Sequence, residues 1–330
     1  MNQHLKRGVT SSARGVGLLA IGGAQIGLGF VVTGLRFGIR RTQKFADLPD
    51  LPEGRVVDLP GRGRVVVLDT GAPTPNAPTV LLLHGLATTA ALCWFSVLDE
   101  LRAGHRVVMF DQRWHGRGIS SDHFSLDDCA DDAAAVLDAL EVDRAIVVGY
   151  SMGGALAQVF AHRHAERMAG LVLCSTAAAW RGNLGDRAFY SLLTGLNGRF
   201  RSHTHSRVQA RFASLPELAG PGVDMSSWAW TEFRSTSAWS LPEVMGELGN
   251  FDARSWLPDV TAPTPVGVTA RDRAIPTRRQ REMAALIPNA TVRESPGGHA
   301  SIVFDSTNWK PIFLEAIAEV TARSHSDVTV

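Results

Sequence analysis

Residues 149–153, with the sequence G-Y-S-M-G, constrain the fold more than any other feature of this chain. The run before them, 144–148, is short, rich in β-branched residues and almost wholly apolar, which is typical of a strand buried in a parallel sheet. The residues after the serine, 152–164, carry apolar side chains on one helical stripe and contain no proline. A strand that passes into a helix through G-x-S-x-G predicts a tight turn that presents the hydroxyl of Ser151 outward. Ser151 is therefore the candidate nucleophile.

A serine hydroxyl is a weak nucleophile at neutral pH, so it needs a base and an acid that orients the base. Asp272 follows an apolar run at 264–269 that predicts a further buried strand. His299 lies in a glycine-rich loop after a strand expected at 290–294. These two residues are the candidate acid and base. Two structural alternatives stay open, because Asp272 could cap the helix expected at 277–287 and His299 could be a structural loop residue.

A tetrahedral intermediate also needs two backbone N–H donors for its oxyanion. The strand expected at 79–83 runs into the loop 84–88, H-G-L-A-T, where the glycine allows the chain to turn back over the sheet. We assign the two donors to the N–H groups of Leu86 and Met152. Met152 would begin the helix after the serine, where unpaired N–H groups favour negative charge.

Together these motifs resemble the α/β-hydrolase superfamily, over about residues 55–322. Residues 111–120, D-Q-R-W-H-G-R-G-I-S, resemble the family's D-x-R-G-x-G-x-S loop, although Trp114-His115 stands where the family often has Gly-His. The chain order Ser, Asp, His is also the order of that family. With the segment 128–132, the block is similar to bacterial, especially actinobacterial, esterase- or lipase-like hydrolases. The resemblance implies carboxylic ester hydrolysis, and it implies structural roles for His84 and His115.

The expected fold class is α/β, namely the α/β-hydrolase fold with a mostly parallel, doubly wound sheet. Between the strand that ends near 175 and the one that begins near 263 lie some 85 residues that this sheet does not need. We expect them to form a helical lid inserted after the sixth strand, with helices at 186–198 and 207–215. The expected organisation is an N-terminal hydrophobic segment, a core in two pieces and a lid, at 1–45, 46–176 with 251–330, and 177–250 respectively.

Aromatic residues gather in the second half of the expected lid. They could form the small core of the lid itself, or an apolar wall over the acyl pocket, because pockets for lipophilic ligands are lined by such side chains. Some of these aromatic residues could serve the core of the lid and others the wall of the pocket. The residues are Trp228, Trp230, Phe233 and Trp239.

Composition argues against several classes of function. The net charge of +1 at pH 7 gives no nucleic-acid footprint. A G-x-G-x-x-G after a strand and a P-loop lysine are both missing from the sequence, so we expect no nucleotide cofactor. The odd number of cysteines and the lack of C-x-x-C spacing argue against a disulfide framework and a zinc site. Neither a cofactor nor a metal is therefore expected.

Residues 15–35 form an uncharged stretch of 21 residues near the N-terminus. A helix of that length spans about 30 Å, the thickness of a bilayer core. We therefore expect a membrane anchor or a membrane-lying helix, with the catalytic domain on the cytoplasmic side. Many glycines weaken this reading, so a cleaved secretory signal or a soluble N-terminal helix remain alternatives. The expected localisation is membrane-associated, with a cytoplasmic or a secreted protein as the alternatives.

The expected activity is that of a serine hydrolase that cleaves carboxylic esters, in particular lipophilic acyl esters, through an acyl-enzyme on Ser151. The substrate partner would be a small-molecule or lipid ester. The same triad could serve a cofactor-free haloperoxidase or perhydrolase, a C–C hydrolase or an acyltransferase. A non-catalytic, ligand-binding α/β-hydrolase-like protein is the alternative from a different class. Dehalogenases and epoxide hydrolases of this superfamily use an aspartate nucleophile, so Ser151 argues against them.

Overall fold

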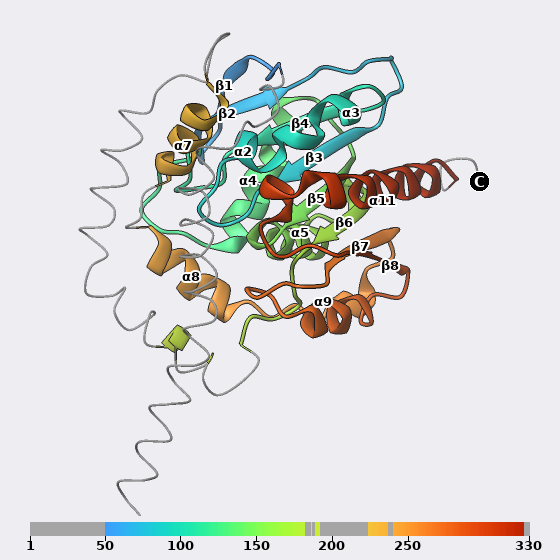
Figure 1. The fold of residues 1–330 in the computed structure, drawn as a ribbon. Helices are drawn as coiled ribbons and strands as arrows, with labels where there is room; N and C mark the ends of the chain where they lie inside the picture. Colours follow the sequence, from blue (N-terminus) through green and yellow to red (C-terminus); the bar gives the residue numbers. More distant parts are fainter. Residues whose placement is uncertain (1–49, 182–185, 187–188, 192–223, 237–239, 327–330) are drawn as a thin grey trace, which may run out of the picture.

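The protein is described here by a computed structural model that covers residues 50–181, 186, 189–191, 224–236 and 240–326. Within these residues, eight strands form a single sheet in the order β1-β2-β4-β3-β5-β6-β7-β8 (Figure 1). The strands are β1 Gly54–Leu59, β2 Gly63–Asp69, β3 Thr79–Leu83, β4 Arg106–Phe110, β5 Ala145–Tyr150, β6 Met168–Cys174, β7 Thr264–Thr269 and β8 Ala290–Ser295. The expected mostly parallel sheet is confirmed, because only β1 with β2 and β2 with β4 pair antiparallel.

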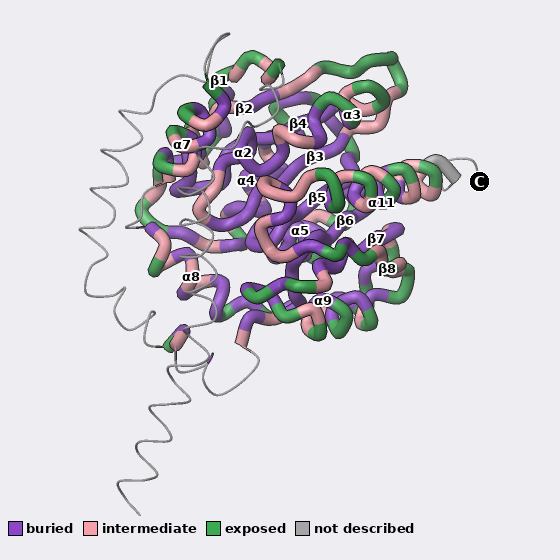
Figure 2. Tube along the Cα trace, viewed as in Figure 1, coloured by how far each residue is buried: buried purple, intermediate pink, exposed green. Residues whose placement is uncertain are grey.

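Helices cover both faces of the sheet. The helices are α2 Ala90–Trp94, α3 Leu98–Arg102, α4 Leu126–Ala139, α5 Met152–Arg163, α7 Met225–Ser235, α8 Leu241–Asn250, α9 Thr277–Ala284, α10 Ser301–Phe304 and α11 Ser306–Ser326. Side chains alternate along β3, so that Leu81 and Leu83 join one core cluster with α4 and α5. Val80 and Leu82 join the opposite cluster with α2, α3 and α11. The central strands are consequently buried on both faces, as Figure 2 shows.

Where the expected strands and helices fall on described residues, they agree with the observed ones except at their ends. The expected strands at 79–83 and 264–269 match β3 and β7 residue for residue. The helix expected at 277–287 ends at Ala284 in the structure. Its last residues continue as tighter turns, since the N–H groups of Leu286 and Ile287 donate to carbonyls three residues back. The apolar pattern therefore ran three residues beyond the regular helix.

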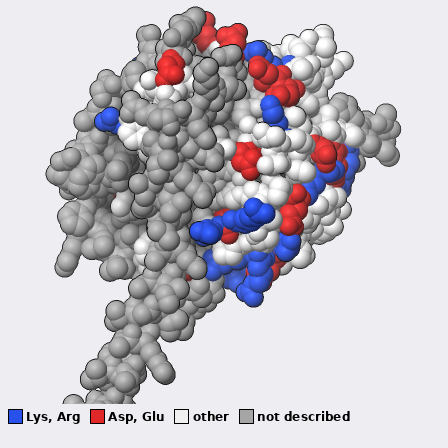
Figure 3. All heavy atoms as spheres, viewed as in Figure 1, with Lys and Arg blue, Asp and Glu red and all other residues white. Residues whose placement is uncertain are grey.

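Charged side chains are interspersed on the surface. On the face drawn in Figure 3, atoms of both signs mix, without one large patch of a single sign among the residues that are coloured. Ion pairs between side chains at least partly exposed include Arg281 with Glu294 and Arg293 with Glu319. The arrangement agrees with a net charge close to zero.

The structure describes only part of the proposed lid. The helices α7 and α8 lie within the proposed lid, 177–250, whereas the helix expected at 207–215 and most of the one at 186–198 lie outside the described residues. The domain boundaries therefore stay a prediction.

The expected membrane-associated localisation is corrected, because no helix in the part of the chain that the structure describes has both the length and the apolar character to cross a bilayer. The segment 15–35 that prompted this expectation lies outside the described residues.

Candidate active site

Ser151 lies on the turn between β5 and α5, in a backbone conformation that is rare for a residue with a side chain. Its φ is 56° and its ψ is −115°. The turn is tight enough that a Cβ on Gly149 would collide with the backbone of Gly153, and a Cβ on Gly153 would collide with the carbonyl of Leu83. The N–H of Ser151 donates to the carbonyl of Cys174 over 3.0 Å, which ties the turn to the neighbouring strand β6. This is the geometry of a nucleophile elbow.

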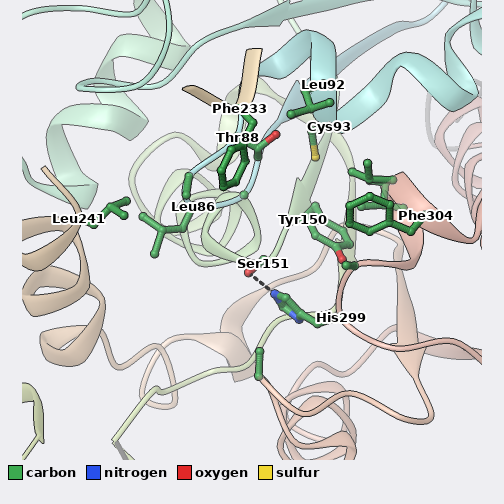
Figure 4. A pocket seen from close by; sticks show the side chains of 16 residues that line it. Leu86, Thr88, Leu92, Cys93, Tyr150, Ser151, Phe233, Leu241, His299 and Phe304 are labelled. Carbon is green, nitrogen blue, oxygen red and sulfur yellow. Dashed lines mark hydrogen bonds between the residues drawn. The ribbon is translucent and has the colours of Figure 1, made fainter. Parts of the chain in front are cut away.

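The three residues that the sequence suggested for a triad form one chain of hydrogen bonds. The distance from Ser151 Oγ to His299 Nε2 is 2.8 Å (Figure 4), and that from His299 Nδ1 to Asp272 Oδ2 is also 2.8 Å. Because a carboxylate only accepts, the proton of the neutral ring belongs on Nδ1. Nε2 is then free to accept the proton of the serine hydroxyl.

The carboxylate of Asp272 is fully buried and held by several donors. Its Oδ1 accepts the N–H groups of Ala274 at 2.9 Å and Ile275 at 2.8 Å. Its Oδ2 accepts, besides the imidazole, the hydroxyl of Thr269 at 2.7 Å and the amide of Gln280 at 3.1 Å. These bonds fix the orientation of the carboxylate toward the histidine ring.

The alternative role of Asp272 as a helix cap is not what the structure shows. The N-cap residue of α9 is Pro276, so Asp272 instead closes the turn that precedes the helix. The loop that carries His299 is tied to the loop of Asp272 by the bond from Arg271 N–H to the carbonyl of Gly297, at 2.9 Å. The ends of two adjacent strands, β7 and β8, therefore bring Asp272 and His299 together.

The loop after β3 lies over the serine. Leu86 lines the cavity at Ser151, and Met152 is the first residue of α5, where an N–H has no acceptor within the helix. His84 supports this loop, since its Nε2 accepts the N–H of Gln112 at 2.8 Å and its Nδ1 donates to the carbonyl of Gly85 at 2.8 Å. Burial lowers the pKa of His84 to about 4, so the ring is neutral near pH 7.

His115 lies behind the same loop. Its ring meets that of His84 edge-on, with the centroids 5.2 Å apart, and its Nδ1 lies 2.8 Å from the carbonyl oxygen of Arg113. Burial lowers the pKa of His115 to about 3, with a smaller contribution from His84. Both histidines thus bind backbone groups around the site, in agreement with the structural roles that the family resemblance implied.

A cavity of about 280 Å³ opens at Ser151 and His299. Its walls come from the loop after β3, from α2 and α10, and from α7 and α8 of the insertion. The apolar side chains in these walls point into the cavity (Figure 4), and they include Leu86, Leu92, Phe233, Leu241 and Phe304. Among the described residues, none that lines it is an aspartate, glutamate, lysine or arginine.

The sequence matches a family model described as the alpha/beta hydrolase fold over residues 78–306. The chain belongs to the alpha/beta hydrolase fold family. This hydrolase is 28% identical to "Putative carbamate hydrolase RutD" from Variovorax paradoxus over 255 residues, which cover 75% of the chain and 94% of that relative.

Solved structures of hydrolases share the fold of this alpha/beta hydrolase. One is a hydrolase from Pseudomonas aeruginosa, with a TM-score of 0.64 and 22% identity, over 82% of this chain and 99% of the other. Another is the enol-lactonase from Burkholderia xenovorans, with a TM-score of 0.62 and 21% identity, over 80% of this chain and 100% of the other. At 21–22% sequence identity, these similarities show a shared fold and nothing about the substrate.

Several residues at the site of this alpha/beta hydrolase were not singled out from the sequence. Tyr150 packs against His299, with their ring centroids 5.6 Å apart. Its position within the G-x-S-x-G motif is a sequence signal from which this role could have been predicted. Thr269 and Gln280 bind Asp272, and Glu232 of α7 is buried beside the loop after β3. No sequence pattern marks these three residues, because each contacts a partner that lies in a different element of the fold.

Proposed function

We propose that this hydrolase cleaves carboxylic esters with an apolar acyl group, through an acyl-enzyme on Ser151. One observation carries the proposal: the hydrogen-bonded chain of Ser151, His299 and Asp272 ends in an apolar cavity. A nucleophile, a base and an acid in this order are the parts that acyl transfer needs.

In the proposed reaction, Ser151 Oγ attacks the ester carbonyl while His299 Nε2 takes its proton. Asp272 keeps the imidazole in the required tautomer and stabilises its charged form. The N–H groups of Leu86 and Met152 would bind the oxyanion of the tetrahedral intermediate. The alcohol leaves with the proton from His299, and water activated by the same ring then releases the acid.

The cavity supports a preference for uncharged acyl groups of medium length. At about 280 Å³, the cavity lies close to the lower end of the range of ligand pockets, roughly 300–1,000 Å³, so it suits a small to medium acyl group. Among the described lining residues, no aspartate, glutamate, lysine or arginine offers a counter-ion to a charged acyl group. We therefore expect lipophilic acyl esters to be better substrates than acetyl esters.

Carbamate esters are the second candidate substrates. The similarity to a relative named as a carbamate hydrolase favours them, and attack at a carbamate carbonyl would use the same residues. The apolar lining favours a neutral carbamate ester over a free carbamate anion.

The test is a series of p-nitrophenyl esters from acetyl to dodecanoyl, with an N-alkyl carbamate ester in parallel. We expect kcat/KM to rise from acetyl to about octanoyl and to fall for chains that exceed the cavity. A sharp preference for the acetyl ester would rule out the proposed acyl preference. Faster turnover of the carbamate would favour the second candidate, and transfer of the acyl group to added hydrogen peroxide or to a second alcohol would favour a perhydrolase or an acyltransferase.

Ser151→Ala is the matched variant for the nucleophile. It should remove both turnover and labelling by a fluorophosphonate, while circular dichroism shows the fold unchanged. If the variant were still labelled, another residue would be the nucleophile. If the unmodified protein turned over none of the esters, the non-catalytic alternative would gain support.

A further inference from the structure

We infer that Glu232 is a positioning residue for the acyl cavity: its buried carboxylate ties helix α7, and with it Phe233, to the loop that precedes α2. The inference rests on the proposed function, since it concerns how that cavity selects the length of an acyl chain.

The carboxylate of Glu232 is 1% exposed and accepts three directed hydrogen bonds. Its Oε2 accepts the hydroxyl of Thr89 at 2.6 Å and Nη1 of Arg117 at 3.1 Å. Its Oε1 accepts Nη2 of Arg117 at 2.8 Å, so that the guanidinium binds both oxygens. A two-point contact of this kind fixes the direction of the side chain as well as its distance.

Both partners of Glu232 belong to the surroundings of the serine. Thr89 directly follows the loop 84–88 and caps α2, because its hydroxyl accepts the N–H of Leu92 at 3.2 Å. Arg117 lies in the loop after β4, where its N–H donates to Asp111 at 2.7 Å. The other carboxylate oxygen of Asp111 accepts the N–H of Ala90, also at 2.7 Å. The start of α2 is thus held from two sides.

Phe233 is the next residue after Glu232 on α7, and it forms part of the cavity wall together with Leu92 of α2 (Figure 4). Further back on α7, Trp228 and Ala229 pack on α2 in a small apolar cluster. Phe233 also stacks on Trp230, with the ring centroids 5.9 Å apart. The carboxylate of Glu232 therefore lies at the end of α7 that contributes Phe233 to the cavity wall.

Apolar contact alone does not set the position of this wall, because the hydrophobic effect has no preferred direction. The three bonds of Glu232 do set it, and moving α7 away would leave a buried charge without its partner. Phe233 is thereby held at a fixed distance from Ser151. The binding of acyl chains that are long enough to reach Phe233 should therefore depend on the hydrogen bonds of Glu232. The binding of acyl chains that end near Ser151 should not.

Glu232→Gln tests the inference. It keeps the shape of the side chain but removes its charge and turns an amide group toward Arg117. We expect KM for the octanoyl ester to rise about tenfold with kcat within about twofold, and both constants for the acetyl ester to stay within about twofold. Equal losses on both esters would overturn the inference, as would no change on either.

A double-mutant cycle with Phe233→Ala asks whether Glu232 acts through that ring. If it does, adding Glu232→Gln to Phe233→Ala should raise KM for the octanoyl ester little further. Independent, additive effects would contradict this. Should Glu232→Gln fail to fold, Arg117→Lys gives a second test, since lysine keeps the positive charge but cannot bind both carboxylate oxygens as the guanidinium does. It too should raise KM for the octanoyl ester and leave the acetyl ester unchanged.

Glu319→Gln on α11 is the matched control. Glu319 also accepts a threonine hydroxyl, from Thr291 at 2.8 Å, and an arginine guanidinium, from Arg293 at 2.9 Å. It packs against β8, and it is not among the residues that line the cavity. This variant should keep the full dependence on chain length.

Binding of 1-octanol separates a failure of this inference from a failure of the proposed function. Calorimetry should show weaker binding to Glu232→Gln than to the unmodified protein and to Glu319→Gln, whether or not any ester is turned over. Turnover of esters with unaltered octanol binding in Glu232→Gln would leave the proposed function standing and overturn the inference.

Discussion

At the scale of single residues, the site depends on which atoms accept and which donate. Asp272 accepts every hydrogen bond that the structure gives its carboxylate, including the one from His299 Nδ1. A residue of equal size with a different pattern of donors should therefore disturb the site without removing its shape.

Asp272→Asn is expected to lower kcat by about 10³- to 10⁴-fold. The amide would face Nδ1 with a donor or a weaker acceptor, and the imidazole would lose its preferred tautomer. Ester turnover under saturating substrate measures the change. Thr269→Val is the control, because it removes a neighbouring bond to the same carboxylate and leaves the imidazole contact in place, so its loss should be much smaller. Equal losses would show that the carboxylate's surroundings, rather than its bond to the imidazole, matter most.

His84 should make the protein less stable in acid. Its pKa is lowered from 6.5 to about 4 in the folded state, so the unfolded chain binds more protons between these values and stability falls as the pH drops through them. At pH 5 the loss from this residue is about 2 kcal/mol of unfolding free energy. Urea unfolding at pH 7.5 and pH 5 measures it. In His84→Gln the difference between the two pH values should shrink by about that amount, and an unchanged difference would contradict the assignment.

At the scale of elements, the turn between β5 and α5 shows what the sequence could and could not predict. The strand, the helix and the chain order of Ser151, Asp272 and His299 follow from local patterns, since periodicity and glycine spacing are properties of neighbouring residues. The partners Thr269, Gln280 and Glu232 could not be found this way, because each acts across a contact between separate elements. The ends of helices were also beyond reach, as the tight turns after α9 illustrate.

Gly153→Ala tests how closely this turn packs on β3. A Cβ at this position would collide with the carbonyl of Leu83, and a backbone carbonyl has little room to move. We expect the unfolding free energy to drop by roughly 1–3 kcal/mol or more, together with a loss of turnover. Gly104→Ala is the control, since a Cβ there meets nothing within 4 Å. Similar midpoints of thermal unfolding for both variants would contradict the close approach.

At the scale of the whole molecule, the site is joined to the core that lies under α11. Tyr150 packs against His299 on one side, and its ring centroid lies 6.2 Å from that of Trp309 on the other. Trp309 in turn stacks on Phe313 at 4.8 Å. A continuous row of rings therefore runs from α11 to the imidazole of His299.

Trp309→Ala is expected to lower the unfolding free energy by about 3–5 kcal/mol, because a buried indole leaves a large cavity. Since Tyr150 would lose its support, kcat should fall as well, even at a temperature where the variant is fully folded. Trp309→Phe keeps an aromatic ring at this position and should retain most of the unfolding free energy and most of kcat. Loss of stability with normal turnover would show that the row of rings does not reach the site functionally.

The spacing of the site along the chain has a consequence for synthesis on the ribosome. Ser151 and His299, whose side chains are hydrogen-bonded in the fold, are 148 residues apart. The proposed nucleophile therefore leaves the exit tunnel long before its proposed base has been translated. Until β7, β8 and the loop of His299 have joined the sheet, the nascent chain carries only an ordinary serine hydroxyl. If Ser151 and His299 act as proposed, hydrolysis can begin only after His299 has been translated and its loop has joined the sheet.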